Sequence, residues 1–177
     1  MTGAPNSIDF ASVYDESIWR VYGFVGFRVK SRQDAEDLTQ QTFERALRAW
    51  ARFDPDRGSA ESWLLSIARN LIIDHYRSDR SFMNKPLDEG RAELARGIVP
   101  SPEEGLGVAP ELAAALDTLD DRERELIALR FGGDLSGPEI ARVTGLSLAN
   151  VQQILSRALR QLRTALVREA PAAALGA

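Results

Sequence analysis

The chain has 177 residues, of which 44% are hydrophobic and 27% are charged, the composition of an ordinary globular protein. Its formal net charge of −4 argues against a protein that binds nucleic acid through overall charge alone. The absence of cysteine excludes disulfide bonds and thiolate metal sites.

Helical periodicity dominates the first 80 residues. Apolar residues at helical spacing predict a first helix from about Phe10 to Val29. Ser31, with Asp34 three residues later, resembles a capping box and indicates the start of a second helix. Turn-forming residues over 54–59 predict a loop, and a further helix is expected from about Glu61 to Arg80.

The helix from Glu61 to Arg80 has an apolar face and a basic face that carries one aromatic side chain. Such a basic face, preceded by a loop with glycine and serine, can neutralise phosphates and hold an unstacked base of single-stranded DNA. A core helix with a solvated outer side is the alternative that composition leaves open. Trp50 and Trp63 are expected in the core, and so is His75, the only histidine of the chain.

No site for catalysis or for a cofactor is expected. A catalytic role for His75 would need a second convergent group, which the sequence does not indicate, and the chain lacks clusters with metal-ligand spacing and glycine loops that cradle phosphates. The first ten residues do not resemble a signal peptide, and no apolar run approaches the roughly 20 residues that cross a bilayer. A cytoplasmic protein without membrane insertion is therefore expected.

Periodicity is lost over residues 81–110, where prolines, glycines and acidic residues gather. The net charge is −1 over residues 1–80, −6 over 81–125 and +3 over 126–177. A Pro/Gly-rich acidic stretch is typical of a flexible linker, so the flanking domains are expected to move independently. Charge separated in this way suits a protein with one polyanion-binding end.

Helices return after this linker. Periodic residues over 112–119 predict one helix, and Asp120 with Glu123 forms a capping box that predicts another, to about Phe131. Gly132 and Gly133 are expected to end that helix.

The last two predicted helices have the layout of a helix-turn-helix. Ser136 and Glu139 open a short helix over Pro138–Thr144, and Gly145 permits a left-handed turn at its end. A longer helix follows from Leu148 to about Val167. A short helix, a glycine turn and a longer helix together are typical of proteins that read DNA in the major groove.

The outward face of this long helix is polar and free of acidic residues, so a phosphate backbone could approach it. Glutamine can bond adenine, and arginine can bond guanine or phosphate. An amphipathic helix with a solvated basic face is the alternative. The residues expected to contact DNA are Ser147, Asn150, Gln152, Gln153, Ser156, Arg157, Arg160 and Arg163.

Two stretches of the chain, taken together, resemble the extracytoplasmic-function branch of the sigma-seventy family. Asp34 to Trp50 (DAEDLTQQTFERALRAW) and Ser62 to Arg77 (SWLLSIARNLIIDHYR) are similar to the family's second conserved region. Residues 116–163, which include the helix-turn-helix, are similar to the fourth region. The order, the spacing and the linker between them also fit.

The resemblance implies an all-α protein of two small helical domains joined by a flexible linker. The second-region domain is expected over residues 8–80 and the linker over 81–110. The fourth-region helix-turn-helix domain is expected over residues 111–168, and a disordered tail over 169–177.

The resemblance also implies a function without enzymatic activity. The chain is expected to bind core RNA polymerase, to direct promoter-specific initiation of transcription, and to be regulated by an anti-sigma factor. The residues implied in docking on the polymerase clamp helices are Asp34, Asp37, Gln40, Gln41 and Glu44. Those implied in recognising and melting the minus-ten element are Arg57, Ser59, Ser62, Arg69, Asn70, Tyr76, Arg77 and Arg80. The long C-terminal helix is implied in reading the minus-thirty-five element.

The chain departs from the family pattern at two places. Gln152-Gln153-Ile154 stands where family members often have Lys-Ser-Arg, and Gln41 replaces a common glutamate in the docking helix. The alternative function is a stand-alone helix-turn-helix regulator, which leaves the docking helix and basic face of the first domain unexplained. A helical enzyme or a pure interaction module lacks a supporting site.

Overall fold

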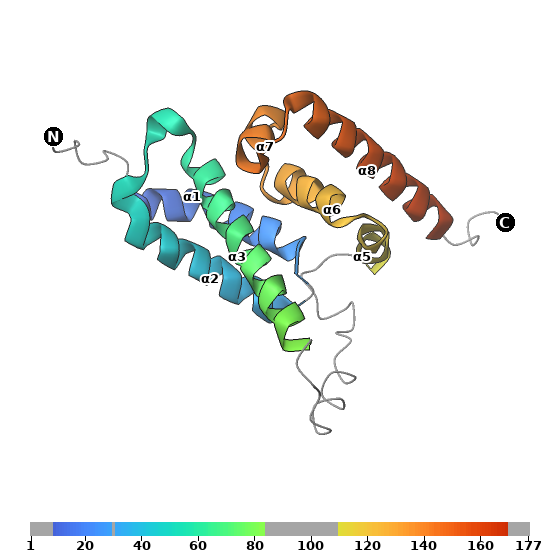
Figure 1. Ribbon diagram of the computed structural model, residues 1–177, viewed down its shortest axis with the longest axis horizontal. Coiled ribbons are helices and arrows are strands. Elements are labelled where there is room, and N and C mark those ends of the chain that lie inside the picture. Colours follow the sequence, from blue (N-terminus) through green and yellow to red (C-terminus); the bar gives the residue numbers. More distant parts are fainter. Residues whose placement is uncertain (1–8, 30, 84–109, 170–177) are drawn as a thin grey trace, which may run out of the picture.

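The computed structural model describes residues 9–29, 31–83 and 110–169, and within these ranges it contains helices and no strand. The first domain consists of α1 (Phe10–Gly26), α2 (Arg32–Ala49) and α3 (Ala60–Met83), with short 3-10 turns η1 (Trp50–Arg52) and η2 (Pro55–Arg57) before α3 (Figure 1). The second domain consists of α5 (Pro110–Asp117), α6 (Asp121–Ile127), a π-helical turn η3 (Ala128–Gly132), α7 (Gly137–Thr144) and α8 (Leu148–Glu169). The predicted all-α class is confirmed.

The predicted linker begins too early by a few residues, because α3 continues to Met83. The rest of that predicted linker, up to residue 109, and most of the predicted tail lie outside the described residues.

The helices begin at the capping residues that the sequence indicates. The backbone N–H of Asp34 donates to the Ser31 hydroxyl at 3.0 Å. The backbone N–H of Glu123 donates to the Asp120 carboxylate at 2.7 Å, and the Glu123 carboxylate accepts from Asp120 N–H at 3.1 Å. Gly145 has a φ of 73°, so the left-handed turn before α8 is present as expected.

An aromatic cluster holds the loop between α2 and α3. The Trp50 and Phe53 rings stack with centroids 4.9 Å apart, and the Trp63 ring lies 5.3 Å from Phe53. Both tryptophans pack against the core, as predicted. Because Phe53 is buried, residues 54–59 leave the core at a fixed point just before α3.

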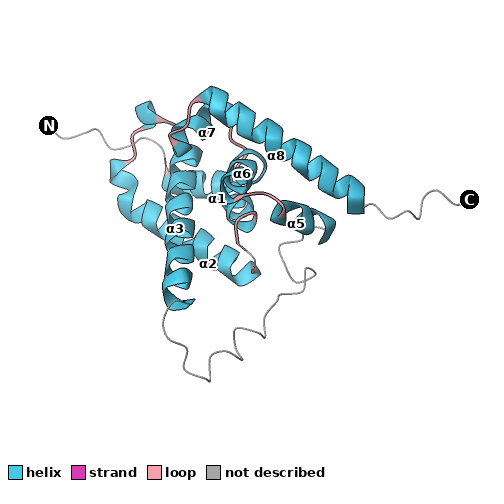
Figure 2. Cartoon of the chain, turned by 45° about the vertical axis from the view of Figure 1, so that its right-hand side comes forward, coloured by secondary structure: helices cyan, strands magenta, loops and turns pink. Residues whose placement is uncertain are grey.

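The two domains pack against each other, with η3 against α1 and α7 against α3 (Figures 1 and 2). Leu129, Ile140 and Val151 of the second domain belong to the same buried cluster as the core of α1, α2 and α3. A smaller cluster, which includes Ile127 and Leu162, joins α5, α6 and α8. The structure thus differs from the expectation of independent domains, because apolar side chains of one domain complete the core of the other.

At Gly23 and Gly132 the backbones of the two domains approach each other closely. A Cβ atom added to Gly132 would lie 2.7 Å from the carbonyl oxygen of Gly23 and 2.8 Å from the backbone nitrogen of Phe24. Only glycine on η3 lets the two backbones approach this closely.

Replacing Gly132 by Ala is expected to force η3 away from α1, since backbone atoms cannot move aside as a flexible side chain can. We expect the free energy of unfolding, measured by urea denaturation, to fall by about 1–3 kcal/mol. Because the chain has no cysteine, spin labels can be attached at introduced cysteines on α3 and α8, at the exposed positions Ser78 and Thr164. The distance distribution between these labels should broaden in the variant.

The matched control is Gly145→Ala, where a Cβ meets nothing within 4 Å although the positive φ adds strain. It should lower stability without broadening the distance distribution. Identical distributions for both variants would contradict the close contact at Gly132.

Candidate nucleic-acid interface

The loop between α2 and α3 carries the first group of residues predicted to bind DNA. Ser62 is buried, its backbone N–H donates to the Ser59 hydroxyl at 3.2 Å, and its own hydroxyl donates to the Ser59 carbonyl at 3.0 Å. Ser62 therefore braces the loop. Arg57 is exposed at the end of η2, and Ser59 is half-buried, so these two are the residues of this group that a ligand can reach.

Further along α3, some of the predicted residues are exposed and others are hydrogen-bonded within the protein. Asn70 and Arg77 are exposed. Tyr76 is half-buried and its hydroxyl donates to the carbonyl oxygen of Arg28; burial raises the pKa of Tyr76. This bond fixes α3 to the end of α1. Arg80 lies within α3, but its side chain is outside the described set.

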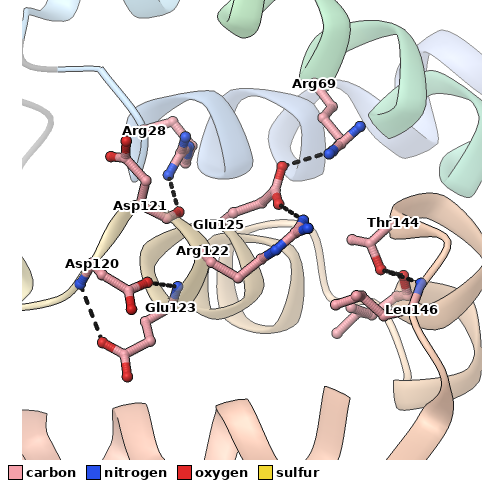
Figure 3. Close-up of polar contacts among 10 residues, drawn as sticks. Arg28, Arg69, Asp120, Asp121, Arg122, Glu123, Glu125, Thr144 and Leu146 are labelled. Carbon is pink, nitrogen blue, oxygen red and sulfur yellow. Dashed lines mark hydrogen bonds and ion pairs between the residues drawn. The ribbon is translucent and has the colours of Figure 1, made fainter. Parts of the chain in front are cut away.

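Arg69 is engaged across the domain interface. Its Nε donates to Oε1 of Glu125 at 2.6 Å, and the two side chains are 24% and 9% exposed (Figure 3). The other oxygen of Glu125 accepts from Arg122 at 2.9 Å. The Arg69 guanidinium, which was predicted to meet a DNA phosphate, is thus bonded to a carboxylate of the helix-turn-helix domain.

Two further arginines cross the same interface. Arg28 donates to the carbonyl oxygen of Asp121 at 2.9 Å, and burial lowers the pKa of Arg28 (Figure 3). Arg20 lies 3.6 Å from the Asp134 carboxylate. The Arg28 contact is a charge-assisted hydrogen bond, which is stronger than a neutral one, whereas the Arg20 contact is a longer ion pair between exposed side chains.

The helix-turn-helix of α7 and α8 is formed as the sequence indicates. The Asn150 backbone N–H donates to the Ser147 hydroxyl at 3.3 Å, which caps α8. Val151 and Ala158 are buried on the inner face of α8, whereas the apolar Leu148 and Leu166 are partly exposed near its ends. The exposed polar face carries Asn150, Gln152, Gln153, Ser156, Arg160 and Arg163.

Arg157 differs from the other arginines of α8. Its Nε donates to Oε1 of the buried Glu123 at 2.6 Å, and a second nitrogen lies 3.9 Å from Asp120. Glu123 of the α6 capping box therefore holds the Nε of Arg157, whose side chain stays 56% exposed, and the DNA contact of Arg157 stays a prediction.

On α2, the predicted docking residues Asp37, Gln40, Gln41 and Glu44 are exposed. Asp34 is half-buried and its carboxylate accepts from the Ser31 hydroxyl at 2.7 Å. Asp34 therefore belongs to the N-cap of α2 and is less accessible than the other docking residues.

An apolar groove between α1 and α2, which was not predicted from the sequence, adjoins these docking residues. It has a volume of about 690 Å³, and Gln40, Glu44, Trp19 and Leu47 line it. Trp19 is 75% exposed and Leu47 is 59% exposed. The sequence held one signal of this groove: Trp19 and Leu47 are apolar, yet they lie outside the apolar faces of their predicted helices.

Within the ranges that the structure describes, no group of three or more metal-ligating side chains converges. No helix in these ranges is long and apolar enough to cross a membrane.

Comparisons with known proteins agree with this geometry. The family model described as Sigma-70 region 2 matches residues 13–82, and that described as Sigma-70, region 4 matches residues 115–164, together about two thirds of the chain. Over 156 residues the chain is 35% identical to the ECF RNA polymerase sigma factor BldN of Streptomyces coelicolor. The chain belongs to the extracytoplasmic-function branch of the sigma-70 family. Its alignment with BldN covers 86% of this sigma factor and 58% of BldN.

For two further relatives, the alignment covers most of both chains. It is 28% identical over 159 residues to the ECF RNA polymerase sigma factor SigK of Mycobacterium ulcerans, over 89% of this chain and 85% of SigK. The solved structure of CnrH in complex with the cytosolic domain of CnrY aligns with a TM-score of 0.65 and 28% identity, over 91% of this chain and 89% of that one.

The predicted family is thereby confirmed. Region 2 corresponds to α1, α2 and α3, and region 4 to α5 through α8. The family consists of transcription initiation factors without enzymatic activity, as expected for this chain.

Replacing Glu125 by Gln is expected to weaken the contact between the two regions, because it removes the charge that pairs with Arg69. A hydrogen bond to a charged group contributes about 1.5–3 kcal/mol, so the free energy of unfolding should fall by up to that amount. The label distance between positions 78 and 164 should broaden as well.

The control is Glu36→Gln, which removes an equally short pair, Arg32–Glu36 at 2.7 Å, whose side chains are 69% and 54% exposed within one helix. It should leave both readouts nearly unchanged. Equal behaviour of the two variants would show that the Arg69–Glu125 pair does not hold the regions together.

Proposed function

We propose that this sigma factor binds core RNA polymerase in the cytoplasm and directs it to promoters that α8 and the region 2 loop recognise. The proposal rests on one observation. The helix α8 of the capped helix-turn-helix has an exposed face without acidic residues, in a chain that also contains region 2. BldN and SigK are both named RNA polymerase sigma factors. A stand-alone helix-turn-helix regulator would give region 2 no role.

In this proposal the N-terminal part of α8 reads the minus-thirty-five element. Gln152 and Gln153 are exposed near the start of the helix, where helix-turn-helix proteins meet base edges. Arg160 and Arg163 lie further along and contact phosphates, which position the protein without reading sequence. Arg157 braces α8 against Glu123 and is not expected to read bases.

The region 2 loop and α3 would recognise and melt the minus-ten element. Arg57, Ser59, Asn70 and Arg77 can be reached by a strand without rearrangement. The Nε of Arg69 is bonded to Glu125 and its side chain is only 24% exposed, so a phosphate reaches this guanidinium fully only after it leaves Glu125. Promoter melting by all these residues therefore requires regions 2 and 4 to separate.

Core polymerase would dock on α2 and on the adjoining groove. The polar residues Asp37, Gln40, Gln41 and Glu44 supply hydrogen-bonding and charged groups, and the exposed Trp19 and Leu47 supply apolar surface. Interfaces depend most on such aromatic anchors beside a polar rim.

An anti-sigma factor is a further proposed partner. CnrH, which is similar to this chain, is described in complex with the cytosolic domain of CnrY. A protein that binds while regions 2 and 4 are packed together would keep Arg69 on Glu125 and so oppose promoter melting.

Replacing Gln153 by Ala is expected to cost about 1–3 kcal/mol at the preferred promoter and to relax preference at one or two bases. Replacing Arg160 by Ala should weaken all promoters alike and reduce the salt dependence of binding. The measurement is transcription and DNA binding by each reconstituted holoenzyme on promoters mutated through the minus-thirty-five element. Equal losses on every promoter for Gln153→Ala would move Gln153 to the phosphate-contacting residues.

Replacing Trp19 by Ala is expected to raise the dissociation constant for core polymerase about tenfold, as loss of an interface anchor does. Because Trp19 is largely exposed, the circular dichroism spectrum should not change. Asp37→Lys, at an exposed position of α2, should also weaken binding. The control is Phe131→Ala, an exposed aromatic residue on η3 outside the groove. If Trp19→Ala binds core as the wild type does, the groove is not part of the docking surface.

A further inference from the structure

A cavity of about 400 Å³ lies where the region 2 loop meets α7 of region 4. Its size falls in the usual range for small-molecule sites. Region 2 contributes side chains from η1, the loop and the first turns of α3, and region 4 contributes α7, which lies beside the loop end of α3 in Figure 2. The lining residues that matter for its chemistry are Arg52, Arg57, Ser59, Trp63, Ser66 and Arg142.

The cavity has an excess of positive charge. Among the described residues, no carboxylate lies within ion-pair distance of Arg52, Arg57 or Arg142, whereas Arg20, Arg69 and Arg157 all have acidic partners. Such unpaired guanidinium groups bind phosphate oxygens well, through several parallel N–H donors.

Two carboxylates lie at or near the cavity, and both already accept hydrogen bonds. Asp54 lines the cavity and accepts from the Asp56 backbone N–H at 3.0 Å. Glu139 accepts from the hydroxyl and the backbone N–H of Ser136, at 2.6 and 2.8 Å. Bonds from Ser136, the positive charge of Arg142 and a weaker bond from Ser59 hold the pKa of Glu139 below its usual range. Within the described residues neither carboxylate lies within ion-pair distance of the three arginines, but the charge of Arg142 acts on Glu139, so Arg52 and Arg57 are the guanidinium groups most available to an anion.

The cavity wall also suits a nucleobase. Trp63 lies in the wall, supported by the ring of Phe53 at 5.3 Å. The Ser66 hydroxyl donates to the Trp63 carbonyl oxygen at 2.6 Å, which leaves its oxygen free to accept from a ligand. An aromatic wall with arginines and hydroxyl groups is the combination with which proteins hold a base and its phosphate.

Arg142 reaches the region 2 loop at a glycine. A Cβ atom added to Gly58 would lie 3.3 Å from a guanidinium nitrogen of Arg142. The guanidinium therefore packs directly over the loop backbone and completes a site that neither domain forms alone.

We propose that this cavity binds a nucleoside phosphate, with the phosphate between Arg142 and the arginines of region 2 and the base beside Trp63. The bound nucleotide bridges the two regions and stabilises their packed arrangement. Binding itself does not depend on the promoter-recognition function proposed above. The consequence that the nucleotide opposes promoter opening does rest on it, because opening requires the regions to separate.

The test is calorimetric titration of the full chain with guanosine and adenosine 5′-triphosphates, with adenosine, and with inorganic phosphate. We expect saturable binding of the triphosphates, and binding at least about tenfold weaker for adenosine or phosphate alone. Arg142→Ala and Arg52→Ala, one from each region, should each weaken triphosphate binding about tenfold. Arg168→Ala, an exposed arginine of α8 outside the cavity, is the control and should bind as the wild type does. The triphosphate should also narrow the label distance distribution between positions 78 and 164.

No saturation up to about 10 mM, or equal binding by the wild type and both cavity variants, would overturn the proposal. It is also overturned if Arg142→Ala weakens binding of a single-stranded minus-ten oligonucleotide as much as it weakens binding of the nucleotide, because the cavity would then belong to the promoter-strand site. Promoter opening by the holoenzyme, assayed without added nucleotide, should be unchanged in Arg142→Ala. Failure of the wild-type holoenzyme to open any promoter would count against the proposed function alone and leave the titration result standing.

Discussion

The backbone contact between Gly23 of α1 and Gly132 of η3 decides how near the two regions of this sigma factor can come. At this separation the apolar side chains of α6 and α7 reach the core of region 2, and Glu125 reaches Arg69. The cavity beneath Arg142 also exists only at this separation, since its two walls belong to different regions. A slightly wider spacing would weaken all three features together, because apolar contacts weaken within about an ångström and the hydrogen bond of the Arg69–Glu125 pair is lost over a similar distance.

The distribution of charge explains how a chain with a net charge of −4 presents basic surfaces. Many acidic side chains on the second domain are used internally: Glu123 and Glu125 are buried, and each accepts from an arginine. The exposed face of α8 keeps its arginines without acidic neighbours on that helix. Pairing therefore divides the arginines into those that hold the molecule together and those available to a polyanion.

The sequence predicted local features well and long-range contacts poorly. Capping at Ser31, Asp120 and Ser147 and the turn at Gly145 depend on residues three or four positions apart, so they could be read directly. The exposed polar face of α8 was predictable for the same reason, although its sequence does not show that Arg157 also binds Glu123. Arg157 pairs with a residue 34 positions away, and Arg69 with one 56 positions away. No periodicity within a helix reveals such partners, and a linker's composition does not reveal whether the domains beside it share a core.

The number of residues in the π-helical turn η3 determines how α7 and α8 are oriented relative to α6. The backbone N–H of Gly133 donates to the carbonyl oxygen of Ala128 at 2.9 Å, five residues back, so this turn holds one residue more than an α-helical turn. Removing one residue here would restore ordinary helical spacing and rotate α7 and α8 by about 100° relative to α6. Gly132 would then face away from α1, and region 4 would present a bulkier residue to it. Relatives that differ by a single insertion or deletion in this turn should therefore assemble their two regions differently, even where every other contact residue is retained.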